Sequence, residues 1–163
     1  MNKFEKVFHG SPVEFDGPEA IPKRNIRSSM ENGERVVKFD EESFHATPHE
    51  WIALAYTYHP KVIDDSEKNV TYNMGVSLFD DNKEVVIHGV NNLEESLQHM
   101  YGDGGHLYSF DANKFVYKEG LGPLEVVSSD PVAPLEVEFI EDSVSRMKDL
   151  GVRFIFIDVT KKI

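Results

Sequence analysis

Early in the chain an apolar run ends in a histidine, a glycine and a serine, which offer a ligand three different groups. His9 supplies a ring nitrogen, Gly10 a backbone that a ligand can approach closely, and Ser11 a hydroxyl. Because Pro12 follows at once, we expect a strand that ends here and presents these groups at the edge of a sheet. By itself the tripeptide is also typical of a surface turn, so its interpretation depends on partners elsewhere.

Two later segments could supply those partners. Phe44 and His45 end a second predicted strand, and Tyr56 lies on the helix predicted to follow it. Successive strand residues point to opposite faces, so only one of Phe44 and His45 can face the same site as His9. Glu125 lies on a third predicted strand, much later in the chain. Taken singly, each side chain is also typical of a core or of an ordinary surface, and their order along the chain is what favours a shared cleft.

Common motifs that use histidine, serine or glycine do not fit this chain. His45 and His49 are four residues apart, but Pro48 in the first helical turn puts His45 outside the predicted helix. The metalloprotease pattern needs a second histidine at position 53, which is Ala53. A nucleophile elbow, a phosphate-binding loop and a dinucleotide fingerprint are all missing from the sequence. We therefore predict no metal ligands.

The composition is that of a globular protein, because 40% of the 163 residues are hydrophobic and 11% are aromatic. We expect a single domain, 1–163, with its own core. No apolar run suits a membrane span or a signal peptide, and the chain lacks cysteine, so we predict a cytoplasmic protein without a membrane partner. The net charge of −12 disfavours general binding to nucleic acid.

The hydrophobic pattern predicts many short strands and a few helices, which together indicate an α+β fold. Thr47 and Glu50 have the spacing of a capping box for a helix that ends before Pro60, and Asn92 is a good N-cap for a helix over 93–100. A third helix is expected over 140–150. Strands are expected at 36–39, 43–46, 70–78, 84–87, 106–110, 115–117, 124–128, 132–139 and 152–159.

The segment 12–34 shows no convincing period and is rich in proline, glycine, asparagine and serine, so we predict a long loop with a turn at 31–34. Lys23, Arg24 and Arg27 form a small basic cluster within it. A solvated loop is the simpler interpretation of that cluster, and a local phosphate contact is the alternative.

Three stretches carry a resemblance to a known family. They are 8–11 (FHGS), 44–47 (FHAT) with the helix that carries Tyr56, and 124–128 (LEVVS). Their residue types and their order resemble the ADP-ribosyltransferase superfamily, in particular the members with a His-Tyr-Glu type triad. These include poly-ADP-ribose polymerases, diphtheria-like toxins and rifamycin ADP-ribosyltransferases. The likeness extends over most of the chain, although each motif is short.

The resemblance implies a fold in which two small antiparallel sheets form a cleft, flanked by a few helices, and it implies that NAD binds in that cleft as a substrate. His9 would then act as a catalytic residue that donates a hydrogen bond to a ribose hydroxyl, and Ser11 would assist at the same ribose. The backbone of Gly10 would pair with the carboxamide of nicotinamide.

The same resemblance assigns the remaining residues. Tyr56, with Phe44 or His45 opposite, would hold the flat nicotinamide ring, whose positive charge suits aromatic faces. Glu125 would be the second catalytic residue and would hold the ribose 2′-hydroxyl. Breaking the bond between nicotinamide and ribose forms an oxocarbenium-like state, which a fixed carboxylate stabilises. The implied reaction is transfer of ADP-ribose to an unknown acceptor, which is a protein, a small molecule or water.

The sequence departs from the family at two positions. The first aromatic position is usually tyrosine, whereas Phe44 and His45 stand here, and Pro123 stands two residues before Glu125, where protein-modifying members carry Glu or Gln. Two other functions therefore stay open. One is a module that binds NAD or another nucleotide without turnover, and the other is a small interaction protein in which the His-Gly-Ser junction is only a turn.

Overall fold

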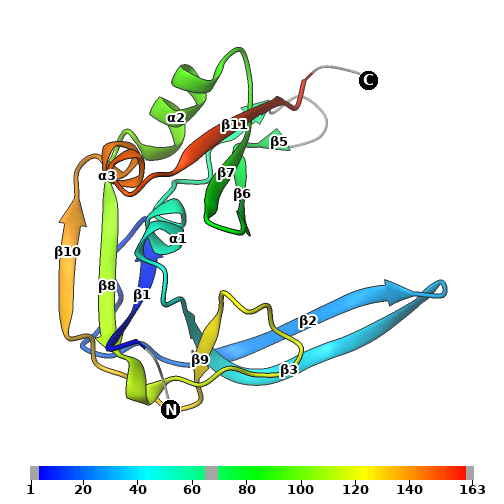
Figure 1. Cartoon of the computed structure of the whole chain (residues 1–163), viewed down its shortest axis with the longest axis vertical. Helices are drawn as coiled ribbons and strands as arrows, with labels where there is room; N and C mark the ends of the chain where they lie inside the picture. Colours follow the sequence, from blue (N-terminus) through cyan, green and yellow to red (C-terminus); the bar gives the residue numbers. More distant parts are fainter. Residues whose placement is uncertain (1–3, 65–69, 161–163) are drawn as a thin grey trace.

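The computed structural model describes residues 4–64 and 70–160, and it has the expected α+β architecture (Figure 1). The helices are α1 (Glu50–Ala55), α2 (Leu93–Tyr101), α3 (Ser143–Asp149) and the 3₁₀ turn η1 (Ala112–Lys114). The strands are β1 (Lys6–Ser11), β2 (Lys23–Glu31), β3 (Glu34–Ala46), β4 (Val62–Asp64), β5 (Val70–Thr71), β6 (Asn73–Phe79), β7 (Asn82–Gly89), β8 (Gly105–Asp111), β9 (Val126–Ser128), β10 (Glu136–Ile140) and β11 (Arg153–Asp158).

The expected pair of antiparallel sheets is wrong. Over residues 4–64 and 70–160 the strands form three three-stranded sheets, in the orders β1-β8-β10, β11-β7-β6 and β2-β3-β9, and the two-stranded pair β4-β5. One sheet is mixed, because β11 runs parallel to β7. The alternation of side chains predicts where a strand lies but not which strand it pairs with. The pairing of strands that are distant in the sequence therefore cannot be predicted from this pattern.

The predicted loop over 12–34 contains a strand. β2 pairs with β3 in a long hairpin that extends away from the rest of the molecule, and we call this hairpin the arm (Figure 1). Its turn was expected, and Asn32 and Gly33 adopt the positive φ angles of 52° and 79° that such a turn requires. β2 escaped prediction because nearly all of its residues are exposed, so it shows no alternation of apolar and polar side chains.

Helix α1 is shorter than predicted and lacks the expected capping box. It begins at Glu50, and the cap position is held by His49 without a side-chain hydrogen bond. Thr47 instead forms an isolated bridge with Phe8, in which the two backbones exchange hydrogen bonds of 2.7 and 2.9 Å. That bridge keeps Thr47 extended, and its hydroxyl accepts a hydrogen bond from the His49 N–H at 3.1 Å.

The local signals at the other two helices are confirmed. The Asn92 side chain accepts the Glu95 N–H at 2.9 Å and so caps α2. Gly151 follows α3 with a φ of 89°, the conformation that ends helices and favours glycine. None of the helices that the structure describes is long and apolar enough to cross a membrane.

Two apolar clusters flank the segments that carry the predicted site. One surrounds α1 and includes Leu54, Ile87 and Met147, all of them fully buried. The other lies beneath β1, β3 and β8 and includes Phe44 and Phe110. β1 packs against α1 and is bridged to the end of β3, so residues from both clusters meet along it.

Candidate functional site

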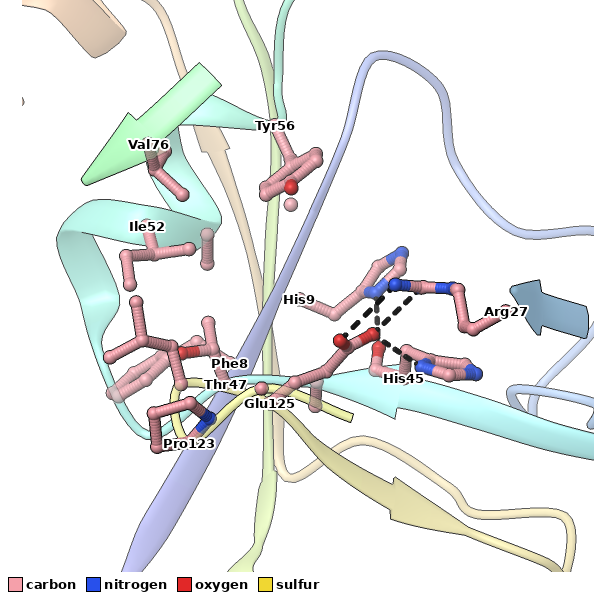
Figure 2. Close-up of a pocket in the computed structure, with 15 residues that line it drawn as sticks. Phe8, His9, Arg27, His45, Thr47, Ile52, Tyr56, Val76, Pro123 and Glu125 are labelled. Carbon is pink, nitrogen blue, oxygen red and sulfur yellow. Dashed lines mark hydrogen bonds and ion pairs between the residues drawn. The ribbon is translucent and has the colours of Figure 1, made fainter. Parts of the chain in front are cut away.

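A pocket of about 350 Å³ opens where β1, the end of β3, α1 and the segment before β9 converge (Figure 2). This volume lies at the lower end of the range found for ligand sites. One wall is polar and the other is formed by apolar groups. The lining residues are Phe8, His9, Gly10, Arg27, His45, Ala46, Thr47, Ile52, Ala53, Tyr56, Val76, Gly122, Pro123, Leu124 and Glu125.

His9 lies on β1 with its ring wedged between aromatic side chains. Its centroid is 4.6 Å from that of Phe44 and 5.5 Å from that of Phe15. The Nδ1–H donates to the backbone oxygen of His45 at 2.8 Å, since a carbonyl can only accept. Burial lowers the pKa of His9 despite this hydrogen bond. The ring is therefore neutral near pH 7, and its Nε2 carries a lone pair that can accept a hydrogen bond.

Gly10 is required by the packing of β1 against α1. A Cβ at this position would lie 1.7 Å from the backbone oxygen of Ala53, so any side chain would push α1 away from β1. The glycine that the sequence assigned to ligand approach thus also sets the distance between strand and helix, and Gly10 and Ala53 both line the pocket.

Glu125 immediately precedes β9, and its carboxylate forms hydrogen bonds with two neighbouring side chains, His45 and Arg27 (Figure 2). Its Oε1 accepts a hydrogen bond from His45 Nδ1 at 2.5 Å and one from Arg27 Nη2 at 2.9 Å. Arg27 Nη1 reaches Oε2 at 3.4 Å. Burial raises the pKa of Glu125, but the His45 hydrogen bond and the Arg27 charge outweigh it, so the net pKa is lowered and the carboxylate is ionised near neutral pH.

Tyr56 follows the last turn of α1, and its ring projects into the pocket from the side opposite Glu125 (Figure 2). The ring is half exposed. Burial, and then the negative charge of Glu125, raise the pKa of its hydroxyl, which is therefore neutral. Ile52 and Val76 extend the apolar wall beside it, so this side of the pocket offers a surface suited to a flat ring.

Two predicted site residues lie outside the pocket. The hydroxyl of Ser11 donates to the Val13 backbone oxygen at 2.7 Å, a local turn contact. Phe44 is 8% exposed and packs against Phe110 and Phe115 in the core. The alternation along β3 settles the choice between Phe44 and His45, because the inward face takes Phe44 and leaves His45 to the pocket.

Two residues that the sequence did not assign to the site belong to it. Arg27 was grouped with a basic loop cluster, but the register of the arm shifts between Arg27 and Ser28, and such bulges turn a side chain toward a new direction. Ser43 donates to, or accepts from, His45 Nε2 at 2.8 Å. A signal for Ser43 was present, because it stands two residues before His45 on one strand and so shares its face.

No family model, curated protein or solved structure matches this chain. In residues 4–64 and 70–160, no three or more ligating side chains are grouped so that they could hold a metal ion. The interpretation of the pocket therefore depends on its own geometry and charges.

Proposed function

We propose that this pocket binds the nicotinamide–ribose end of NAD and breaks the bond between them, which is the reaction of the superfamily that the sequence resembles. One observation carries the proposal: His9, Tyr56 and Glu125, which come from three distant segments, line a single pocket. The pocket combines an ionised carboxylate, an imidazole and an aromatic ring. Its volume of about 350 Å³ suits part of a dinucleotide, so the adenosine half would extend toward solvent.

His9 would accept a hydrogen bond from a ribose hydroxyl through Nε2. The expected direction of this bond is therefore reversed, because Nδ1 is committed to His45 and the ring is neutral. The Gly10 backbone would pair with the carboxamide, and the ring of Tyr56 would face the nicotinamide. Glu125 would accept the ribose 2′-hydroxyl and lie near the carbon that becomes positively charged.

The reaction itself is a glycosidic cleavage. The bond between ribose C1′ and the ring nitrogen breaks, both of its electrons leave with nicotinamide, and the pyridinium becomes a neutral ring. The positive charge passes to C1′ and the ring oxygen, where a nearby carboxylate stabilises it. Water or an acceptor then forms a bond to C1′ and loses its proton to the solvent. In this scheme Glu125 contributes charge stabilisation and holds the 2′-hydroxyl.

A module that binds NAD without turnover is the second candidate. It is favoured by the ion pair between Arg27 and Glu125, which offsets the negative charge that the transition state needs. It is also favoured by the absence of a tyrosine from the face of β3 where His45 stands. Both candidates predict the same ligand, and only the release of nicotinamide separates them.

Incubation with NAD, followed by chromatographic measurement of free nicotinamide, tests the proposal. We expect release by the wild-type protein and a loss of about a hundredfold or more in Glu125→Gln. Glu119→Gln, an exposed carboxylate shortly before the pocket segment, is the matched control and should leave the rate unchanged. Calorimetric titration with NAD accompanies each variant. Binding without release would favour the inactive module, and the lack of any binding heat would contradict both candidates.

A further inference from the structure

A chain of hydrogen bonds runs from the core through His45 to the pocket. Ser43 Oγ is 2.8 Å from His45 Nε2, and His45 Nδ1 is 2.5 Å from Glu125 Oε1. Both ring nitrogens of His45 therefore have hydrogen-bond partners. The ring of Phe39 packs edge-on against the imidazole, with 5.8 Å between the ring centroids. Ser43 itself is buried, and it does not line the pocket. The orientation of the imidazole is thus fixed from three sides.

Because of these hydrogen bonds, the two carboxylate oxygens of Glu125 differ in how many donors they already bind. Oε1 accepts from both His45 and Arg27, whereas Oε2 has Arg27 Nη1 at 3.4 Å, which is long for a charged hydrogen bond. A carboxylate oxygen can accept two hydrogen bonds. Oε2 is therefore the oxygen with capacity to receive a hydroxyl from a ligand.

We propose that His45 and Ser43 are positioning residues for Glu125, and that His45 serves the site through this carboxylate rather than as a stacking surface for the ligand ring. The role in turnover rests on the proposed function, whereas the effect on Glu125 does not. Because an ionised carboxylate only accepts, His45 Nδ1 donates to Glu125, and Nε2 on the other side of the ring hydrogen-bonds the Ser43 hydroxyl.

Other charged and titratable groups also face this pair. Arg27 on β2 contacts the carboxylate. The hydroxyl of Tyr56, after α1, is uncharged near neutral pH because its pKa is raised. His9 on β1 is hydrogen-bonded to the backbone oxygen of His45. Of these, Arg27 is the second donor to Glu125 Oε1, so its contribution must be separated from that of His45. Arg27→Gln, tested alone and together with the His45 variants, provides this separation.

Two substitutions of His45 distinguish the roles. Glutamine keeps an N–H donor but has no ring, whereas phenylalanine keeps a ring but has no donor. For positioning through Glu125, we expect His45→Gln to keep kcat for nicotinamide release within about tenfold of wild type. We expect His45→Phe to lower kcat by about a hundredfold, with KM for NAD nearly unchanged. The reverse ranking, with a raised KM in His45→Gln, would overturn the proposal in favour of stacking.

A second readout requires no activity. The pKa of the Glu125 carboxyl can be followed by ¹³C NMR, with Glu125→Gln providing the assignment. Loss of the donor in His45→Phe should raise this pKa by about one unit, and Ser43→Ala should raise it less, because the ring loses one of its anchors. Ser43→Thr should restore it. Ser29→Ala, an exposed position on the arm, is the control.

The pKa of Glu125 and the release of nicotinamide test two different claims, so one result can contradict its claim while the other stands. If His45→Phe leaves the pKa of Glu125 unchanged, the positioning role is wrong, even in a protein that releases nicotinamide. If the pKa rises as expected but the wild-type protein releases no nicotinamide, the positioning of Glu125 stands and the proposed reaction falls. His45→Phe and Ser43→Ala must both give dispersed NMR spectra, and Ser43→Thr carries the same test if Ser43→Ala does not fold.

Discussion

The two ends of β3 belong to one strand but are held by different forces. The end at 43–46 is largely buried, pairs with β9 and contributes His45 to the pocket. The other end, near the hairpin turn of the arm, pairs with β2 alone, and Val37 there is 54% exposed. Side-chain packing thus dominates one end and backbone hydrogen bonding the other.

The part of the arm next to the pocket is packed, as buried Phe39 shows, whereas the part near the hairpin turn is exposed. A two-stranded ribbon has little independent stability in water, so the arm should open locally more readily than the body. The pocket depends on the arm through Arg27, which reaches Glu125 from β2. Substitutions in the body should therefore change global stability, whereas equivalent substitutions in the arm should act locally.

A pair of glycine substitutions gives the largest expected contrast. Gly10→Ala places a methyl group 1.7 Å from the backbone oxygen of Ala53, and we expect a loss of at least about 4 kcal/mol in the free energy of unfolding. Gly33→Ala at the tip of the arm meets no atom within 4 Å but has a φ of 79°, so it should cost about 1 kcal/mol, confined to the arm. Thermal and urea unfolding measure both, and equal losses would contradict the contrast.

Truncating one apolar side chain at each end of β3 should give a smaller contrast. Phe44→Ala leaves a cavity among Phe110 and Phe115, and we expect a loss of about 3 kcal/mol in stability. Val37→Ala removes an exposed side chain and should change stability by less than about 0.5 kcal/mol. Urea unfolding with both variants measures the difference. A cost for Val37→Ala similar to that of Phe44→Ala would mean that the arm is packed in solution.

The pH dependence of stability sharpens the same comparison. The pKa of His9 in the fold lies below its ordinary value of 6.5, because burial disfavours the charged ring. The unfolded chain therefore binds the proton more tightly, and the stabilisation by neutral His9 is complete above pH 6.5 and decreases as the pH falls below it. We expect stability to decline between pH 7 and pH 5, and His9→Gln to reduce this slope. An unchanged slope in that variant would show that His9 is accessible to solvent.

The smallest effect is expected at the contact between arm and pocket. Arg27 and Glu125 are 46% and 24% exposed, so Arg27→Gln should cost less than about 1 kcal/mol in stability. Arg24→Gln, which removes an exposed ion pair between β2 and Asp40 on β3, is the matched control and should leave the unfolding midpoint unchanged. Hydrogen exchange in the arm should quicken with Arg27→Gln. If both variants behave alike, Arg27 does not link the arm to the body.

The parts of the fold that the sequence predicted are those with local signals. Asn92 and Gly151 act within one turn of a helix, and the Asn32–Gly33 turn needs only its own backbone angles. The choice of partner strand is not local, so the parallel pairing of β11 and the pairing of β2 were not predicted. Thr47 shows the same limit, because its capping pattern is overridden by a bridge to a strand almost forty residues away.

The site follows the same division. The sequence indicated His9, Gly10, His45, Tyr56 and Glu125, and the structure brings these five together in one pocket. Ser11 and Phe44 were indicated with them, but the Ser11 hydroxyl is hydrogen-bonded within a local turn and the Phe44 ring is buried in the core. Arg27 was missed because its contact depends on the register shift in the arm, whereas Ser43 carried a signal that was not used, its spacing of two residues from His45 on one strand.

The central claim is that three distant segments form one NAD site, and an NMR titration with NAD tests it most directly. We expect backbone amide shifts to cluster at 8–10, 45–47, 52–57 and 122–125, and to saturate with one equivalent per chain. Shifts centred on the separate hollow between Phe15 and Phe139, or no shifts at millimolar NAD, would contradict the claim.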